Sequence, residues 1–160
     1  MKPEIHRYLE LLERRLATLR MLATGLQESR AAITEMDLES INSHIAHQES
    51  LCTEIRFLDG ELEALKRQLS SEFQQDLDLT NLTTLQGLLD PASERRMRGL
   101  VSGLATIQAD VRRLNRVQAE LLRRSRRSIN VLINFMSNYM GTYQPPANRA
   151  ALSMPQQVGK

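Results

Sequence analysis

Hydrophobic side chains recur every three or four residues through most of the chain, the pattern of helices with one apolar stripe. The longest stripe lies between about Leu100 and Tyr143. Its positions are Leu104, Ile107, Val111, Leu114, Gln118, Leu121, Ser125, Leu132, Phe135 and Tyr139. A seam with heptad spacing has to be covered by other helices. We therefore expect a long helix in a bundle with coiled-coil-like packing.

A similar stripe predicts a first helix that begins near Pro3 and ends at about Ala32 or Glu35. Pro3 is acceptable in a first helical turn, where its missing N–H does no harm. The stripe consists of Ile5, Leu9, Leu12, Leu16, Leu19, Ala23, Leu26 and Ile33. Arg30 also falls on this seam, so we expect the packing to loosen there.

A second helix is predicted after Asp37, whose side chain is a good N-cap. Its stripe consists of Ile41, His44, Gln48, Leu51, Ile55, Leu58, Leu62, Leu65 and Leu69. The break at 34–37 is not the only reading of the pattern. A single helix that runs continuously through these residues stays open as an alternative.

The pattern weakens between Ser70 and Ser93, where we expect a short fourth helix over roughly Asn81–Leu89. Asp90–Pro91 is a start signal for the long third helix. Beyond Gly141 the chain has three prolines and no periodicity, so residues 144–160 are predicted to form a flexible tail. The predicted fold is all-α: an elongated antiparallel bundle of three long amphipathic helices in a domain of residues 1–143.

Composition agrees with long helices, because aromatic residues make up only 4% of the 160 residues and Trp is absent. The single cysteine, Cys52, excludes an intramolecular disulfide and is compatible with a reducing cytoplasm. No stretch approaches the roughly 20 apolar residues of a membrane span, and the N-terminus lacks the apolar run of a signal peptide. We expect a cytoplasmic protein that does not insert into membranes.

A conspicuous basic run lies in the third helix and raises the question of nucleic-acid binding. It consists of Arg112, Arg113, Arg116, Arg123, Arg124, Arg126 and Arg127. These arginines take outer positions of the heptad, except Arg124 on the flank, and no aromatic residue is interleaved to stack on bases. We expect a solvated face that pairs with acidic residues of the second helix, and no nucleic-acid partner.

Candidate chemistry is sparse. His44 and His47 are three residues apart, but neither another His nor Cys completes a metal site. Cys52 lies on an apolar flank without a basic neighbour, which favours a small buried hydrophobe. No phosphate-binding loop or nucleophile elbow is present. We expect no catalytic residue, no cofactor, no metal and no enzymatic activity.

Two features of the third helix bear on binding. Gln118 and Ser125 interrupt its seam, either as register-setting polar residues or as the lining of a groove; both readings stay open. The far end is apolar on more than one face and offers anchors at helical spacing. The predicted anchors are Ile129, Leu132, Ile133, Met136 and Met140.

Two segments carry a resemblance to a known family. Residues 114–145, with Leu114-Asn115, Leu121-Leu122 and Tyr143, resemble the C-terminal helix and tail of the FlgN flagellar export chaperones. Residues 36–59 also resemble that family. The resemblance implies a cytoplasmic chaperone of flagellar type III secretion.

Such chaperones bind the C-terminal amphipathic helices of the hook–filament junction proteins FlgK and FlgL, prevent their premature assembly, and deliver them to the export gate protein FlhA. The resemblance assigns the gate contact to Tyr143. The alternative is a structural coiled-coil protein whose apolar surface is a homodimer interface. A nucleic-acid-binding helical protein comes third.

Overall fold

The computed structural model describes residues 3–73 and 89–142, with side chains as far as Ser137. Within these ranges the chain forms three helices, α1 Pro3–Glu35, α2 Leu38–Phe73 and α3 Pro91–Thr142, and no strand. The chain divides into two compact units, residues 1–125 and 126–160. The predicted all-α bundle is confirmed. The short helix expected over 81–89 and the tail at 144–160 fall outside the described residues, apart from Leu89.

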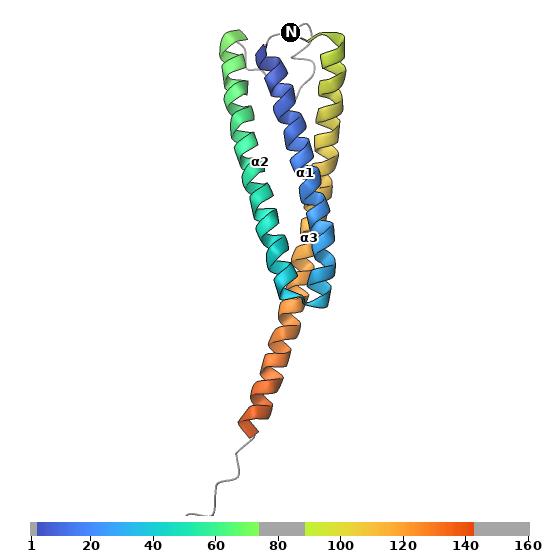
Figure 1. The fold of residues 1–160 in the computed structure, drawn as a ribbon, viewed down its shortest axis with the longest axis vertical. Coiled ribbons are helices and arrows are strands. Elements are labelled where there is room, and N and C mark those ends of the chain that lie inside the picture. The colour runs from blue at the N-terminus through green and yellow to red at the C-terminus, as the bar shows by residue number, and fades with distance from the viewer. Residues whose placement is uncertain (1–2, 74–88, 143–160) are drawn as a thin grey trace, which may run out of the picture. The chain divides into compact units, whose positions relative to one another are not determined.

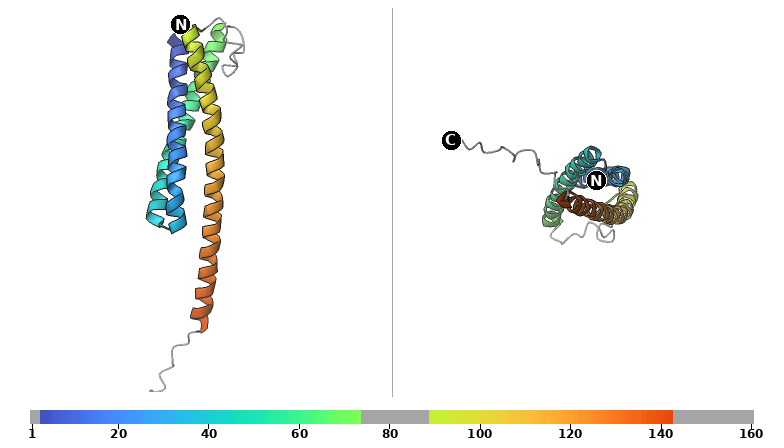
Figure 2. Two further views of the ribbon diagram at one scale, coloured as in Figure 1. Left: turned by 90° about the vertical axis from the view of Figure 1, so that its right-hand side faces the viewer. Right: turned by 90° about the horizontal axis from the view of Figure 1, so that it is seen from below.

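In the first unit, α2 runs antiparallel to α1, and the first part of α3 returns in the direction of α1 (Figures 1 and 2). The start of α1, the end of α2 and the start of α3 therefore meet at one end of this bundle. The close link between α1 and α2 makes them neighbouring antiparallel helices. The up-down-up order follows from the chain connectivity that the sequence predicts.

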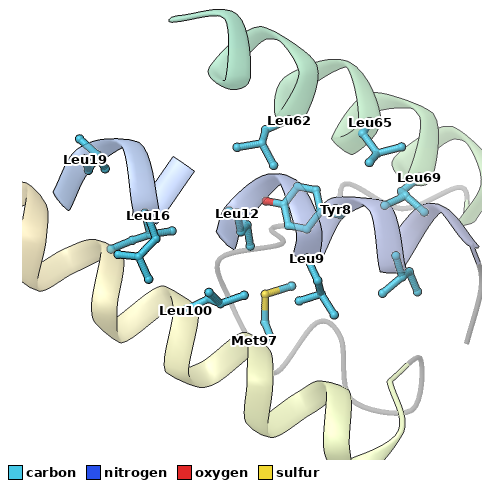
Figure 3. Close-up of a cluster of buried hydrophobic side chains, with 12 residues drawn as sticks. Tyr8, Leu9, Leu12, Leu16, Leu19, Leu62, Leu65, Leu69, Met97 and Leu100 are labelled. Atoms are coloured by element: carbon cyan, nitrogen blue, oxygen red, sulfur yellow. The ribbon is translucent and has the colours of Figure 1, made fainter. Parts of the chain in front are cut away.

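Apolar side chains from all three helices meet in the core of the bundle (Figure 3). Leu9 of α1, Leu58 and Leu69 of α2, and Met97 of α3 are almost completely removed from solvent. All eight apolar positions predicted for the first helix are buried. A second cluster, nearer the α1–α2 turn, contains Leu22, Ala23, Leu26, Leu51 and Leu114. Burial of each such side chain contributes roughly 1.5–3 kcal/mol relative to exposure.

The expected loosening at Arg30 is not found, because Arg30 is exposed and the neighbouring Ser29 takes the buried position. Ala32 and Ile33 continue the buried stripe beyond it. The ideal helix has 3.6 residues per turn, so a stripe drifts from strict heptad positions along a long helix. This drift moves a serine into the core and leaves the arginine in solvent.

The turn between α1 and α2 excludes the alternative of one continuous helix. Met36 has a φ of 56°, in the left-handed region that a helix interior does not allow. The N–H of Asp37 donates to the carbonyl of Ala32 at 3.0 Å, and the N–H of Met36 donates to that of Ile33 at 3.3 Å. This is the Schellman arrangement of a helix C-terminus, with methionine where glycine is usual. Asp37 then caps α2, since its Oδ1 accepts from the N–H of Ser40 at 3.2 Å.

The predicted start of α3 is confirmed. Asp90 Oδ1 accepts from the N–H groups of Ala92 and Ser93, both at 3.0 Å, and Oδ2 accepts from the Ser93 hydroxyl at 2.8 Å. Hydrogen bonds from the N–H and hydroxyl of Ser93, and from the N–H of Ala92, lower the pKa of Asp90 below its ordinary value. The charged cap therefore stabilises α3 above the pKa of free aspartate and is lost as the pH falls through the lowered value.

Ion pairs set the orientation of the helices at the bundle surface. Arg7, Arg14 and Arg15 of α1 pair with acidic residues of α2, Glu61, Glu54 and Asp59. Arg96 of α3 makes two bonds to Glu13 of α1, at 2.6 and 2.7 Å. Each exposed pair adds at most about 1 kcal/mol, so these contacts select the arrangement more than they stabilise it.

A ring of three polar side chains joins the three helices inside the bundle. The Ser29 hydroxyl donates to Gln118 Oε1 at 3.0 Å, and Gln118 Nε2 donates to Gln48 Oε1 at 3.1 Å. Gln48 Nε2 closes the ring on Ser29 Oγ at 3.3 Å. Because each member both donates and accepts, no polar group of the ring is left unpaired. This contact confirms the register-setting reading for Gln118.

We expect Met36→Gly to raise the free energy of unfolding by about 0.5–1 kcal/mol, because glycine adopts the left-handed conformation without the Cβ penalty. Met21 provides a matched control, since it is also exposed but lies within α1. Met21→Gly should lower stability by about 1 kcal/mol. Urea unfolding followed by circular dichroism measures both, and a loss of stability in Met36→Gly would contradict the assigned turn.

We expect Gln118→Met to lower the free energy of unfolding by about 1–3 kcal/mol, because Ser29 and Gln48 lose a hydrogen-bond partner. Gln27→Met, on the exposed side of α1, serves as the control. Equal stability of Gln118→Met and the parent protein in urea unfolding would show that the ring contributes nothing.

Candidate partner-binding segment of α3

The second unit contains a stretch of α3 in which large apolar side chains are exposed. We call residues 129–136 the apolar segment. Its side chains are between 38% and 62% exposed: Ile129, Val131, Leu132, Ile133, Phe135 and Met136. Scattered exposed hydrophobic residues are ordinary, whereas six within about two turns of one helix form a candidate interaction surface.

The apolar segment differs from the part of α3 that lies in the bundle. Leu104 and Leu114 on the α3 seam are buried, whereas Leu132 and Phe135, which continue the same heptad register, are 57% and 62% exposed. The seam that is expected to be covered by other helices is therefore exposed at these two positions.

Four of the five predicted anchors, Ile129, Leu132, Ile133 and Met136, lie together in the apolar segment. The fifth, Met140, belongs to α3, but its side chain lies outside the described residues, and so does the whole of Tyr143. Their predicted roles stay predictions. Val131 and Phe135 were not among the predicted anchors. Their exposure beside the other four adds them to the candidate surface, and the run of apolar residues on both sides of Asn134 was the signal for them.

Three arginines of the basic run, Arg113, Arg123 and Arg124, pair within α3. Arg123 and Arg124 share Glu120, at 2.7 and 3.0 Å, and Arg113 lies 3.5 Å from Asp110. The expected pairing with α2 is not found among the described ion pairs, in which Glu54, Asp59 and Glu61 of α2 pair with arginines of α1. No acidic partner of Arg126 or Arg127 is found in the described ranges.

The other candidate groups do not converge on a chemical site. Within the described residues no cluster of three or more His, Cys, Asp or Glu side chains has the geometry to hold a metal. His44 and Cys52 are half-buried, and His47 borders a shallow pocket of about 300 Å³ beside Gly25. A larger pocket of about 440 Å³ lies over Tyr8 and Leu12. Its charged residues include Arg15 and Asp59, which already pair with each other.

Comparison with known proteins identifies the family. The family described as FlgN protein matches residues 1–151. The chain belongs to the FlgN family. This is a family of flagellar export chaperones, so the membership agrees with the resemblance in the C-terminal helix and in residues 36–59. No curated protein and no solved structure matched the chain.

No helix in the described ranges is long and apolar enough to cross a membrane. Each large apolar side chain gains roughly 1.5–3 kcal/mol when it is fully buried. The arrangement therefore offers a helical surface whose burial would drive association with another protein.

Proposed function

We propose that this FlgN protein is a cytoplasmic chaperone of flagellar type III export. It binds the C-terminal amphipathic helices of FlgK and FlgL through the apolar segment, prevents their premature assembly, and delivers them to FlhA. The exposure of six large apolar side chains in one stretch of helix is the observation that supports this proposal.

Helical spacing makes this surface suitable for an amphipathic helix. Ile129, Ile133 and Met136 lie on one face of α3, and Leu132 and Phe135 lie on another, so each group can contact a helix laid along α3. The flexible methionine adapts to clients of different sequence. A client segment that folds as it binds loses conformational entropy, which keeps the complex reversible. A chaperone that releases its client at the export gate requires such reversibility.

We expect the double substitution Leu132→Ser and Met136→Ser to weaken binding of purified FlgK and FlgL by about 2–4 kcal/mol, because both side chains act as anchors. Isothermal titration calorimetry measures the affinity, and circular dichroism verifies that the variant stays helical. Asn130→Ser with Asn134→Ser is the matched control on the polar side of the same turns.

Two results would contradict this proposal. Unchanged affinity in a helical and soluble variant would place the client site elsewhere. A parent protein that is dimeric in light scattering, becomes monomeric with these substitutions and binds neither client would favour the homodimer interface instead.

Delivery to the gate is proposed for Tyr143, which follows the last residue of α3, Thr142. A tyrosine ring can anchor a second protein by burying its ring and using its hydroxyl as a hydrogen-bond donor. This role is separate from client binding by the apolar segment, so the two functions should separate on substitution.

We expect Tyr143→Ala to weaken binding to the cytoplasmic part of FlhA and to reduce export of FlgK and FlgL, while client affinity and thermal stability stay unchanged. Tyr143→Phe tests whether the ring alone suffices. Pull-down on FlhA and secretion assays measure the two effects. Normal FlhA binding by Tyr143→Ala would reject this residue as the gate contact, and a joint loss of stability and client binding would make it structural.

A further inference from the structure

The apolar segment is wider around the helix axis than one neighbouring helix can cover. At about 100° per residue, its six apolar side chains span an arc of roughly 200°. The buried positions of α3 in the bundle span only about 100° by the same measure, and the two helices α1 and α2 cover them. Those positions are Ser93, Met97, Leu100, Leu104, Leu114 and Gln118. More than one neighbouring helix is therefore needed to cover the apolar segment.

The arc separates into two stripes with the spacing of helix–helix contacts. The first stripe contains Ile129, Ile133 and Met136, and the second contains Val131, Leu132 and Phe135. Each stripe spans about 100° or less, which is the width of an ordinary amphipathic face. Ile133 and Phe135 lie about 160° apart around the axis, so one straight helix cannot contact both.

One arginine borders each stripe. Arg126 precedes Ile129 by one helical turn, and Arg127 precedes Val131 by one turn, so their charges lie at the two outer edges of the arc. The described residues give neither arginine an acidic partner, and the sequence has no Asp or Glu after Glu120. The edges of the surface are thus positively charged without compensation.

We propose that the apolar segment binds two acidic amphipathic helices at once, one on each stripe, with acidic residues of each helix facing Arg126 or Arg127. The inference rests on the proposed function, since it takes the segment to be the client site. Charge complementarity selects this occupant. Two copies of the segment packed in parallel would instead bring the arginines together, and the segment has no acidic residue to pair with them.

Photocrosslinking tests the number of helices. A benzophenone amino acid is placed at position 133 on the first stripe or at 135 on the second, in the full chain bound to purified FlgK or FlgL. Mass spectrometry then maps the crosslinked client residues. We expect the two positions to label two different client helices, or the same helix in a complex with two clients per chaperone.

The outcomes separate the two proposals. Crosslinks from both positions to one client helix in a one-to-one complex would overturn the two-helix inference and leave the client site intact. Crosslinks only between chaperone chains would overturn it in favour of self-association. A parent protein that binds neither client would reject the proposed function and, with it, this inference.

Charge substitutions test the chemistry of the helices. Arg126→Gln and Arg127→Gln should each weaken client binding, roughly three- to tenfold at low salt, and the loss should shrink as salt screens the charges. Asn134→Glu changes the net charge equally but lies on the polar side between the two stripes, so it should have a smaller effect. Equal effects of all three substitutions would show that net charge alone matters and would overturn the acidic-edge assignment.

Discussion

The ring of Ser29, Gln48 and Gln118 is the contact that fixes how the three helices of the bundle align. Apolar stripes attract one another without much preference for register, since leucines one heptad apart are interchangeable in a seam. In the observed alignment of the three helices, each donor of the ring meets an acceptor. Sliding α3 by one turn would remove the buried amide of Gln118 from both of its partners, at a cost of about 1–3 kcal/mol. The leucine clusters supply the cohesion, and the ring selects the alignment in which they form.

Much of this fold follows from hydrophobic periodicity, and the details that do not follow have local physical causes. The buried stripe of α1 and the caps at Asp37 and Asp90 were predictable because spacing and capping chemistry depend on near neighbours. The left-handed Met36 was not, since methionine gives no signal for that conformation. Ser29 replaced Arg30 in the core because a real helix drifts from heptad positions. The partners of the arginines depend on which helices become neighbours. The apolar stripe of a single helix does not determine this.

The candidate site was only partly predictable for a related reason. A heptad pattern says that a surface has to be covered, but not which chain covers it. Leu104 and Leu132 hold equivalent heptad positions, yet Leu104 is 7% exposed and Leu132 is 57% exposed. The excess of apolar residues on more than one face after Ser128 was visible in the sequence, and four of the six exposed side chains were predicted as anchors. Val131 and Phe135 were left out of the anchors because those were chosen by the spacing of a single contact.

Under the proposed function, the contrast between the buried and exposed parts of α3 allows one helix to serve both stability and binding. In the bundle, the seam is narrow, contains a satisfied polar layer and is covered by helices joined to it through the chain. Between Ile129 and Met136, the apolar arc is wider, the described residues hold no acidic group to neutralise its edges, and no polar side chain takes the place of Gln118. A surface without a register-setting group tolerates partners of different sequence. The alignment of a bound helix is then set by the charges at the edges of the surface, whose interactions are weak and reversible. Such a surface is suited to clients that are held, carried and released, and unsuited to a permanent core.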